Sequence, residues 1–154
     1  MENEELADQL ESLLRIDVDA SHAYKQTIEE IDVQEIREQL TQFRGDHERH
    51  IAELSKCIQS LGQEPPKAER DFRGYLIAGF TAIRAKMGIE SALKAMHSNE
   101  KLTNKTYAEA MKWNASEDIH KIIARNYEDE KRHLNYIEQA LNTKAWKVPV
   151  GEKH

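Results

Sequence analysis

Apolar residues recur at every third or fourth position along most of the chain, which is the spacing of one buried face of an α-helix. No convincing run alternates polar and apolar residues as a β-strand would. A capping-box pair, Asp32 and Glu35, begins the second apolar stretch, and Gly62 ends it. Asn114 or Ser116 is expected to cap the last one. The pattern predicts helices at about residues 5–31, 34–61, 71–86, 89–113 and 117–142.

The connections between these helices predict the topology. Only a few residues separate the first two long helices, and only a few separate the last two, so each pair is expected to form an antiparallel hairpin. One long link between Leu61 and Ile89 joins the hairpins and carries the short predicted helix. We therefore expect an all-α fold, a single domain over residues 1–154, built as a four-helix bundle with one long crossover.

The composition is typical of a helix-rich protein with neither a membrane nor a nucleic-acid partner. Charged residues make up 32% of the 154 residues, with only six glycines and three prolines. The net charge is −6 and the basic residues are scattered, so the basic patch of a nucleic-acid-binding protein is missing. No segment approaches the ~18 apolar residues of a membrane span, and no apolar leader follows Met1, so we expect a cytoplasmic protein.

An internal repeat carries the candidate chemistry. Four pairs of residues are separated by the same 83 positions, since 130 − 47 and 133 − 50 both equal 83. These pairs are Asp17 and Glu100, Tyr24 and Tyr107, His47 and Glu130, and His50 and His133. The two hairpins are therefore expected to be related by a pseudo-twofold axis.

The repeated acids and histidines predict a metal site inside the bundle. They lie on or one turn along the apolar faces of four different helices, and buried carboxylates are costly unless cations compensate them. The single cysteine, Cys57, offers no Cys-x-x-Cys pair and is expected to be a small buried packing residue. Oxygen and imidazole ligands suit iron, manganese or zinc. The predicted ligands are Asp17, His47, His50, Glu100, Glu130 and His133.

Glu100, Tyr107, Glu130 and His133 resemble the second half of a ferritin-like di-iron carboxylate protein, especially of the rubrerythrin-related group. The resemblance covers essentially residues 5–142. It implies a ferritin-like bundle that holds two divalent metal ions, with iron favoured over manganese or zinc. It also implies reaction with oxygen or peroxide in oxidative or metal stress, with no catalytic residue beyond the ligands.

The resemblance also implies individual roles. Asp17 and Glu100 look like terminal carboxylates, Glu130 looks like a bridging one, and His50 and His133 look like one imidazole for each metal. The segment around His50 also looks like small bacterial ferritin-like domains without assigned activity.

His47 departs from the family pattern, because the family would place a bridging glutamate there. A neutral imidazole cannot bridge two metals as a carboxylate does. Three carboxylates facing two divalent ions leave a net charge of +1, whereas the usual four leave zero. No rubredoxin-like cysteine module accompanies the bundle in this sequence.

Three functions are compatible with these residues. The first is a non-haem iron or manganese protein with oxidase or peroxidase chemistry. The second is a redox-inert bundle held together by zinc or a similar ion. The third is a metal-free interaction protein with a decayed site. The sequence leaves open whether the chain forms a homodimer or another homo-oligomer.

Some neighbouring residues are assigned less specific roles. Asp19 lies opposite Asp17 on its helix and is expected at the surface. His97 is expected to be a partly exposed histidine rather than an extra ligand. Tyr24 and Tyr107 could equally be core residues or hydrogen-bond donors to the ligands.

Overall fold

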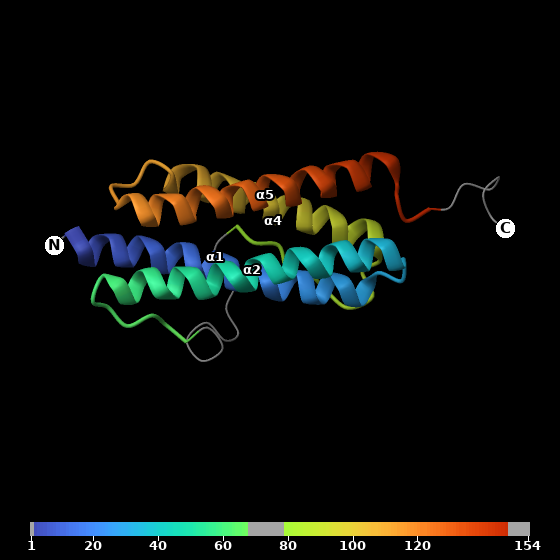
Figure 1. Cartoon of the computed structure of the whole chain (residues 1–154). Coiled ribbons are helices and arrows are strands. Elements are labelled where there is room, and N and C mark those ends of the chain that lie inside the picture. The colour runs from blue at the N-terminus through green and yellow to red at the C-terminus, as the bar shows by residue number, and fades with distance from the viewer. Residues whose placement is uncertain (1, 68–78, 148–154) are drawn as a thin grey trace.

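Four long helices form the bundle in the computed structural model, which describes residues 2–67 and 79–147 (Figure 1). The helices are α1 (Glu2–Glu30), α2 (Gln34–Ser60), α4 (Ile89–Ala110) and α5 (Glu117–Thr143). The described ranges contain no strand. The predicted all-α four-helix bundle is confirmed. None of the helices in these ranges is long and apolar enough to cross a membrane.

The helices form two hairpins, α1 with α2 and α4 with α5, and α1 also packs against α4. α2 ends at one end of the bundle and α4 begins at the other, so α2 and α4 run in the same direction (Figure 1). This connectivity is that of a bundle with two short turns and one long crossover. It places α2 beside α5, and these two helices carry the repeated histidines.

The prediction of a helix at 71–86 is wrong for the residues of this range that the structure describes. Residues 79–86 contain no helix, and residues 71–78 lie outside the described ranges. Lys86 has a φ angle of 63° and Gly88 one of 89°. Neither angle is compatible with a right-handed helix.

Asn99 explains how this segment is held against the bundle. The Thr81 backbone N–H donates to Asn99 Oδ1 at 2.7 Å, and Asn99 Nδ2 donates to the Thr81 carbonyl at 3.0 Å. Ile83 is buried from the same segment. The apolar spacing therefore reflects the docking of a non-helical strap, which uses a side-chain amide to satisfy its backbone groups.

The helix ends follow the sequence signals in part. Ser116 caps α5, because its hydroxyl accepts a hydrogen bond from the Ile119 N–H. Gly62, with a φ of 81°, closes α2 as predicted. The prediction of a capping box at Asp32 is wrong. The N-cap residue of α2 is Val33, whose side chain makes no capping hydrogen bond.

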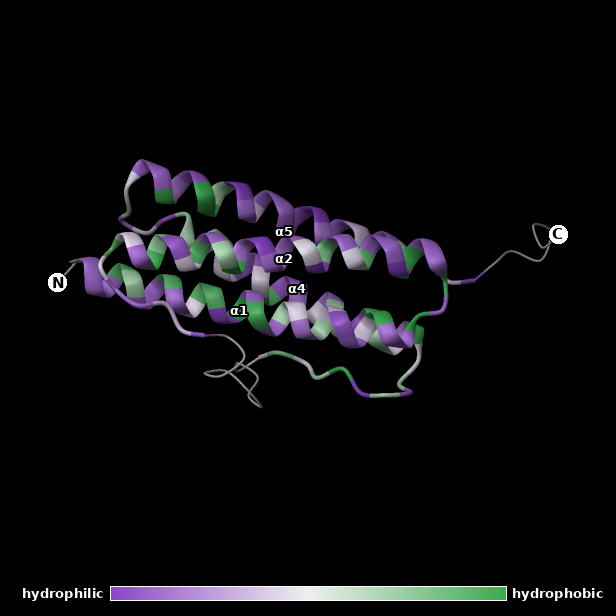
Figure 2. Cartoon of the chain, turned by 60° about the horizontal axis from the view of Figure 1, so that its bottom comes forward, coloured by the Kyte–Doolittle hydropathy of each residue, from purple (hydrophilic) through white to green (hydrophobic). Residues whose placement is uncertain are grey.

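The core consists of two apolar clusters, one toward each end of the bundle, and a polar layer lies between them. Figure 2 shows polar and apolar residues alternating in short blocks along each helix. One cluster is centred on Leu10, Leu13, Leu14, Leu54, Ile58 and Ile123. The other is centred on Tyr24, Ile36, Leu40, Phe43, Leu93, Met96 and Ile137. Cys57 is buried in the first cluster, as predicted.

The prediction that Asp19 lies at the surface is wrong. Asp19 is only 2% exposed, because α1 is buried around its full circumference from Ile16 to Ser21. A helix enclosed in this way has no solvent face on which an acid opposite Asp17 could lie.

Candidate metal centre

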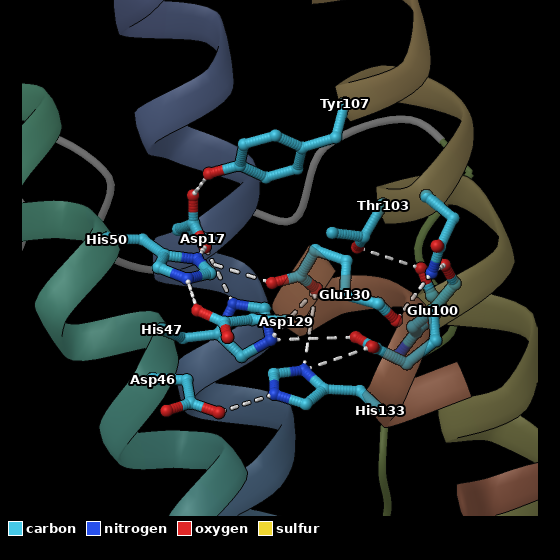
Figure 3. Close-up of polar contacts among 12 residues, drawn as sticks. Asp17, Asp46, His47, His50, Glu100, Thr103, Tyr107, Asp129, Glu130 and His133 are labelled. Carbon is cyan, nitrogen blue, oxygen red and sulfur yellow. Dashed lines mark hydrogen bonds and ion pairs between the residues drawn. The ribbon is translucent and has the colours of Figure 1, made fainter. Parts of the chain in front are cut away.

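Six side chains from all four helices meet in the polar layer, and every one of them is 0% exposed (Figure 3). They are the six ligands predicted from the sequence. Those residues are Asp17 of α1, His47 and His50 of α2, Glu100 of α4, and Glu130 and His133 of α5.

The six residues divide into two overlapping groups that share His47 and Glu130. Within each group, one ligand atom from every residue lies within 4.8 Å of the others. The Asp17 group contains Asp17, His47, His50 and Glu130, and the Glu100 group contains His47, Glu100, Glu130 and His133. Each group therefore has the composition and spacing of a cation site.

In the Glu100 group, the donor atoms converge without bonding to one another. His47 Nε2 lies 3.6 Å from Glu100 Oε1 and 3.4 Å from Glu130 Oε1. His133 Nδ1 lies 3.4 Å from Glu100 Oε2 and 3.6 Å from Glu130 Oε1. None of these buried atoms has a hydrogen-bond partner in the described part of the chain. Buried polar atoms are rarely left without partners, so this convergence indicates a place for a cation.

The Asp17 group, by contrast, is closed by hydrogen bonds. Asp17 Oδ1 lies 2.7 Å from His47 Nδ1 and 2.9 Å from His50 Nδ1. The Tyr107 hydroxyl donates to Asp17 Oδ2 at 2.6 Å. His50 Nδ1 also lies 3.3 Å from Glu130 Oε2. Both oxygens of Asp17 are therefore engaged by protein groups.

Two aspartates outside the six fix the orientation of the outer histidines. His50 Nε2 of α2 lies 2.9 Å from Asp129 Oδ2 of α5, and His133 Nε2 of α5 lies 2.8 Å from Asp46 Oδ2 of α2. When Nε2–H donates to these carboxylates, a neutral ring directs its Nδ1 lone pair toward the centre. This is the carboxylate–histidine arrangement that supports metal-ligating imidazoles.

Arg49 and Arg132 hold the two aspartates in place. Arg132 Nη1 lies 3.0 Å from Asp129 Oδ1, and its Nη2 lies 2.6 Å from Asp46 Oδ2. Arg49 forms ion pairs with the same two aspartates. The sequence interpretation missed all four residues. The signal was present, since 129 − 46 and 132 − 49 both equal 83, so that Asp-x-x-Arg-His occurs in both halves.

The acids of the centre favour protonated histidines. Burial opposes protonation of His47, but the charge of Glu130 and the hydrogen bond with Asp17 outweigh it and raise its pKa to about 9. Burial likewise opposes protonation of His50, yet the charge of Asp17 and the bond with Asp129 raise its pKa to about 11. The pKa of His133 is raised well above its usual value despite burial, chiefly by the charge of Glu130.

Glu130 shows the opposite effect. Burial would raise the pKa of its carboxyl, but the charges of His47 and His133 hold the pKa well below its usual range. Three imidazolium groups beside Asp17, Glu100 and Glu130 balance the charge of the centre. A divalent cation that replaces two of these protons would maintain that balance, so its binding would release protons.

The two repeated tyrosines differ in their contacts. Tyr107 donates to Asp17, whereas the buried Tyr24 hydroxyl has no hydrogen-bond partner among the described residues. The Tyr24 ring packs 5.4 Å from that of His47, and Phe43 packs 4.2 Å from His133, measured between ring centroids. Burial, reinforced by the neighbouring acids, raises the pKa of both tyrosines well above the usual value. Both hydroxyls therefore keep their protons.

Other polar residues support the centre or lie apart from it. Asn104 donates from Nδ2 to the backbone carbonyls of Glu100 at 2.8 Å and Glu130 at 3.0 Å, which ties α4 to α5. His97 Nε2 lies 3.0 Å from Glu138 Oε2 on the partly exposed flank of the bundle. His97 belongs to neither ligand group.

The donor set fits a divalent transition metal. Four carboxylate oxygens and two imidazole nitrogens lack hydrogen bonds in one fully buried cluster, and orienting carboxylates stand behind two of the three histidines. Such mixed oxygen and nitrogen sites suit iron, manganese and zinc. The buried clusters could therefore hold metal ions.

A family model described as a domain of unknown function, DUF2383, matches residues 5–113, which is more than half of the chain. The chain belongs to the DUF2383 family. The matched segment includes Asp17, both α2 histidines and Glu100, and it ends before α5, which supplies Glu130 and His133. No curated protein matches the chain.

Proposed function

We propose that this DUF2383 protein is a ferritin-like metal protein whose centre binds divalent iron or manganese and reacts with oxygen or peroxide. The observation that carries this proposal is the Glu100 group, in which four buried ligand residues present donor atoms without hydrogen-bond partners. Leaving several such atoms unpaired costs about 1–3 kcal/mol for each group, and a bound cation would remove that cost.

The ferritin-like assignment rests on topology and repeat together. The bundle has one long crossover, and both hairpins contribute ligands at the same 83-residue offset. Ferritin-like proteins place inward-facing acids and Glu-x-x-His pairs on four helices in this way. The 0% exposure of all six ligand residues supports a reaction with molecules as small as oxygen or peroxide rather than with a bulky substrate.

The chain's own residues prepare the site for such chemistry. Bound iron would supply electron transfer to oxygen or peroxide. Asp46 and Asp129 orient His133 and His50, and the apolar clusters on both sides of the polar layer exclude water. Tyr107 keeps a proton at its hydroxyl, directed at Asp17 Oδ2.

Anaerobic loading of metal-free protein with Fe(II), followed by exposure to oxygen or peroxide, tests this function. Iron oxidation should be faster than in buffer alone, and Glu130→Ala, which removes the residue common to both groups, should abolish the difference. Unchanged oxidation in that variant would disprove the proposal. Circular dichroism of the variant would confirm that the helices remain.

A second function is favoured by the number and spacing of ligands in the Glu100 group. Two imidazoles and two carboxylates form a complete set for one structural zinc ion. In that case, chelation should lower the melting temperature of the protein, and zinc should restore it, while no oxidation of Fe(II) above the buffer rate is found.

A further inference from the structure

The two ligand groups differ in whether their donors are already bonded. We infer that they are inequivalent cation positions: the Glu100 group takes the first divalent ion, with four protein ligands, and the Asp17 group takes a second ion only more weakly. This inference rests on the proposed metal-binding function and specifies the order in which its positions fill. It makes Asp17 a positioning residue in the singly loaded protein, although its counterpart Glu100 is a ligand.

The spacing of donors in the Glu100 group matches a four-coordinate ion. A tetrahedron of ligands about 2.0–2.2 Å from a metal has edges of about 3.3–3.6 Å. Both imidazole nitrogens lie 3.4–3.6 Å from Glu130 Oε1, and each lies 3.4–3.6 Å from a different oxygen of Glu100. One ion between these residues could therefore be reached by both imidazoles, by Glu130 Oε1 and by the Glu100 carboxylate.

The Asp17 group has shorter separations that belong to hydrogen bonds. Asp17 Oδ1 lies 2.7 and 2.9 Å from the Nδ1 atoms of His47 and His50. A cation bound there would displace protons from both contacts while Tyr107 still holds the second oxygen. Exchanging formed hydrogen bonds for metal ligation reduces the net gain on binding.

His47 joins the two groups through its two ring nitrogens. Nδ1 lies against Asp17, and Nε2 faces Glu100 and Glu130. If Nδ1–H donates to Asp17, the neutral ring presents its Nε2 lone pair to the Glu100 group. Asp17 thus orients His47 as a ligand for the first ion, in the way that Asp46 orients His133.

Charge favours the same order. Glu100 and Glu130 neutralise one divalent ion in the Glu100 group, which has two neutral imidazoles as its other ligands. Adding a second divalent ion brings in only the single charge of Asp17 and leaves +1 among the six fully buried ligands. An uncompensated buried charge is costly, so the second ion should bind more weakly.

Titration of the metal-free, full-length protein with Co(II) tests this order. Visible absorption distinguishes four-coordinate Co(II), which absorbs strongly, from six-coordinate Co(II), and calorimetry counts the ions. The matched variants are Asp17→Asn and Glu100→Gln, which alter equivalent positions of the two halves and keep the side-chain shapes. The wild type should bind one equivalent tightly with the intense spectrum and any second equivalent at least about tenfold more weakly.

The variants should separate the two roles. Asp17→Asn keeps an oxygen that can accept from His47 but loses the orienting charge, so the first ion should lose about 10–100-fold in affinity, whereas Glu100→Gln, which removes a ligand, should cost more than about a hundredfold. If circular dichroism shows that Glu100→Gln is unfolded, the pair His133→Gln and His50→Gln gives the same contrast. Two equivalents of equal affinity, or equal losses in the matched variants, would overturn the inference alone. Absence of Co(II) binding in the wild type would overturn the proposed function as well.

Discussion

Asp129 of α5 lies 2.9 Å from His50 Nε2 of α2, and the reciprocal pair, Asp46 of α2 and His133 of α5, is 2.8 Å apart. Each of these helices therefore orients the outer histidine of the other. The exchange is a direct result of the sequence repeat, because both aspartates precede their own helix's histidine by four residues. It connects the fold to the proposed chemistry, since the two hairpins must be assembled before either histidine is oriented.

Removing these orienting carboxylates should weaken metal binding. Asp46→Asn should lower the affinity for the first Co(II) or Zn(II) ion by about 10–100-fold, because a neutral amide supports the ligating His133 less well. Asp129→Asn should lower the affinity for a second ion instead, because it orients His50. Competition with a coloured chelator measures the loss. Glu128→Gln, next to Asp129 but exposed to solvent, is the control and should bind as the wild type does. Equal affinities in all three variants would contradict an orienting role.

The repeated tyrosines should differ in their contribution to stability. Tyr107→Phe removes the donor to Asp17 Oδ2, so the metal-free protein should lose about 1–3 kcal/mol in its free energy of unfolding. Tyr24→Phe removes a buried hydroxyl that has no hydrogen-bond partner in the described ranges, and it should be nearly neutral or slightly stabilising. Urea denaturation measures both variants. A larger loss for Tyr24→Phe than for Tyr107→Phe would contradict the hydrogen-bond assignment.

The metal-free protein should become less stable as the pH rises. The folded pKa values of about 9 for His47 and about 11 for His50 exceed the unfolded value of about 6.5, so the folded state holds protons that the unfolded state releases. This stabilisation is fully present below about pH 6.5 and is lost as the pH rises through the folded values. The urea midpoint, with chelator present, should therefore be lower at pH 9 than at pH 6.

Two comparisons separate this effect from a general response to alkaline pH. His50→Gln should show a smaller decrease between the two pH values, because one of the titrating groups is absent. Protein saturated with Zn(II) should show no such decrease, since metal binding requires deprotonated ligands and strengthens as protons leave. A midpoint that is unchanged or higher at pH 9 in the metal-free wild type would contradict the raised histidine pKa values.

Loss of Asn99 should release the non-helical strap at residues 79–86 from the bundle. Asn99→Ala removes both hydrogen bonds to the backbone of Thr81, so the Thr81 backbone amide should exchange with solvent faster. Hydrogen–deuterium exchange of peptides covering 79–88 measures this change. Peptides from α5 serve as the control and should keep their protection. Unaltered exchange at Thr81 would show that other contacts hold the strap.

The sequence predicted the helices and the central cluster for the same reason. A helix-period apolar face fixes which side of each helix is buried, and an acid or histidine on that face must then lie inside the bundle. The constant offset further matched the two hairpins, so residues as distant as Asp17 and Glu130 could be expected in one cluster. The structure brings all six predicted ligand residues together.

The residues that the sequence interpretation missed lie beside the apolar faces rather than on them. Asp46, Arg49, Asp129 and Arg132 resemble the ordinary charge pattern of exposed helix surfaces, and only their repetition in both halves marks them. The hydrogen bonds of Asp17 depend on side-chain rotamers across three helices, which periodicity does not encode. The segment 79–86 was misinterpreted because its apolar spacing imitates a helix, whereas Asn99 satisfies its backbone.

The metal content of untagged protein, purified without chelator, tests the central claim most directly. Mass spectrometry should find at least one iron, manganese or zinc ion per chain in the wild type, and none in the Glu130→Ala/His133→Ala double variant, which disrupts both ligand groups. Absence of metal from the wild type, even after anaerobic loading with Fe(II), or equal metal content in the variant, would contradict a metal centre between the four helices.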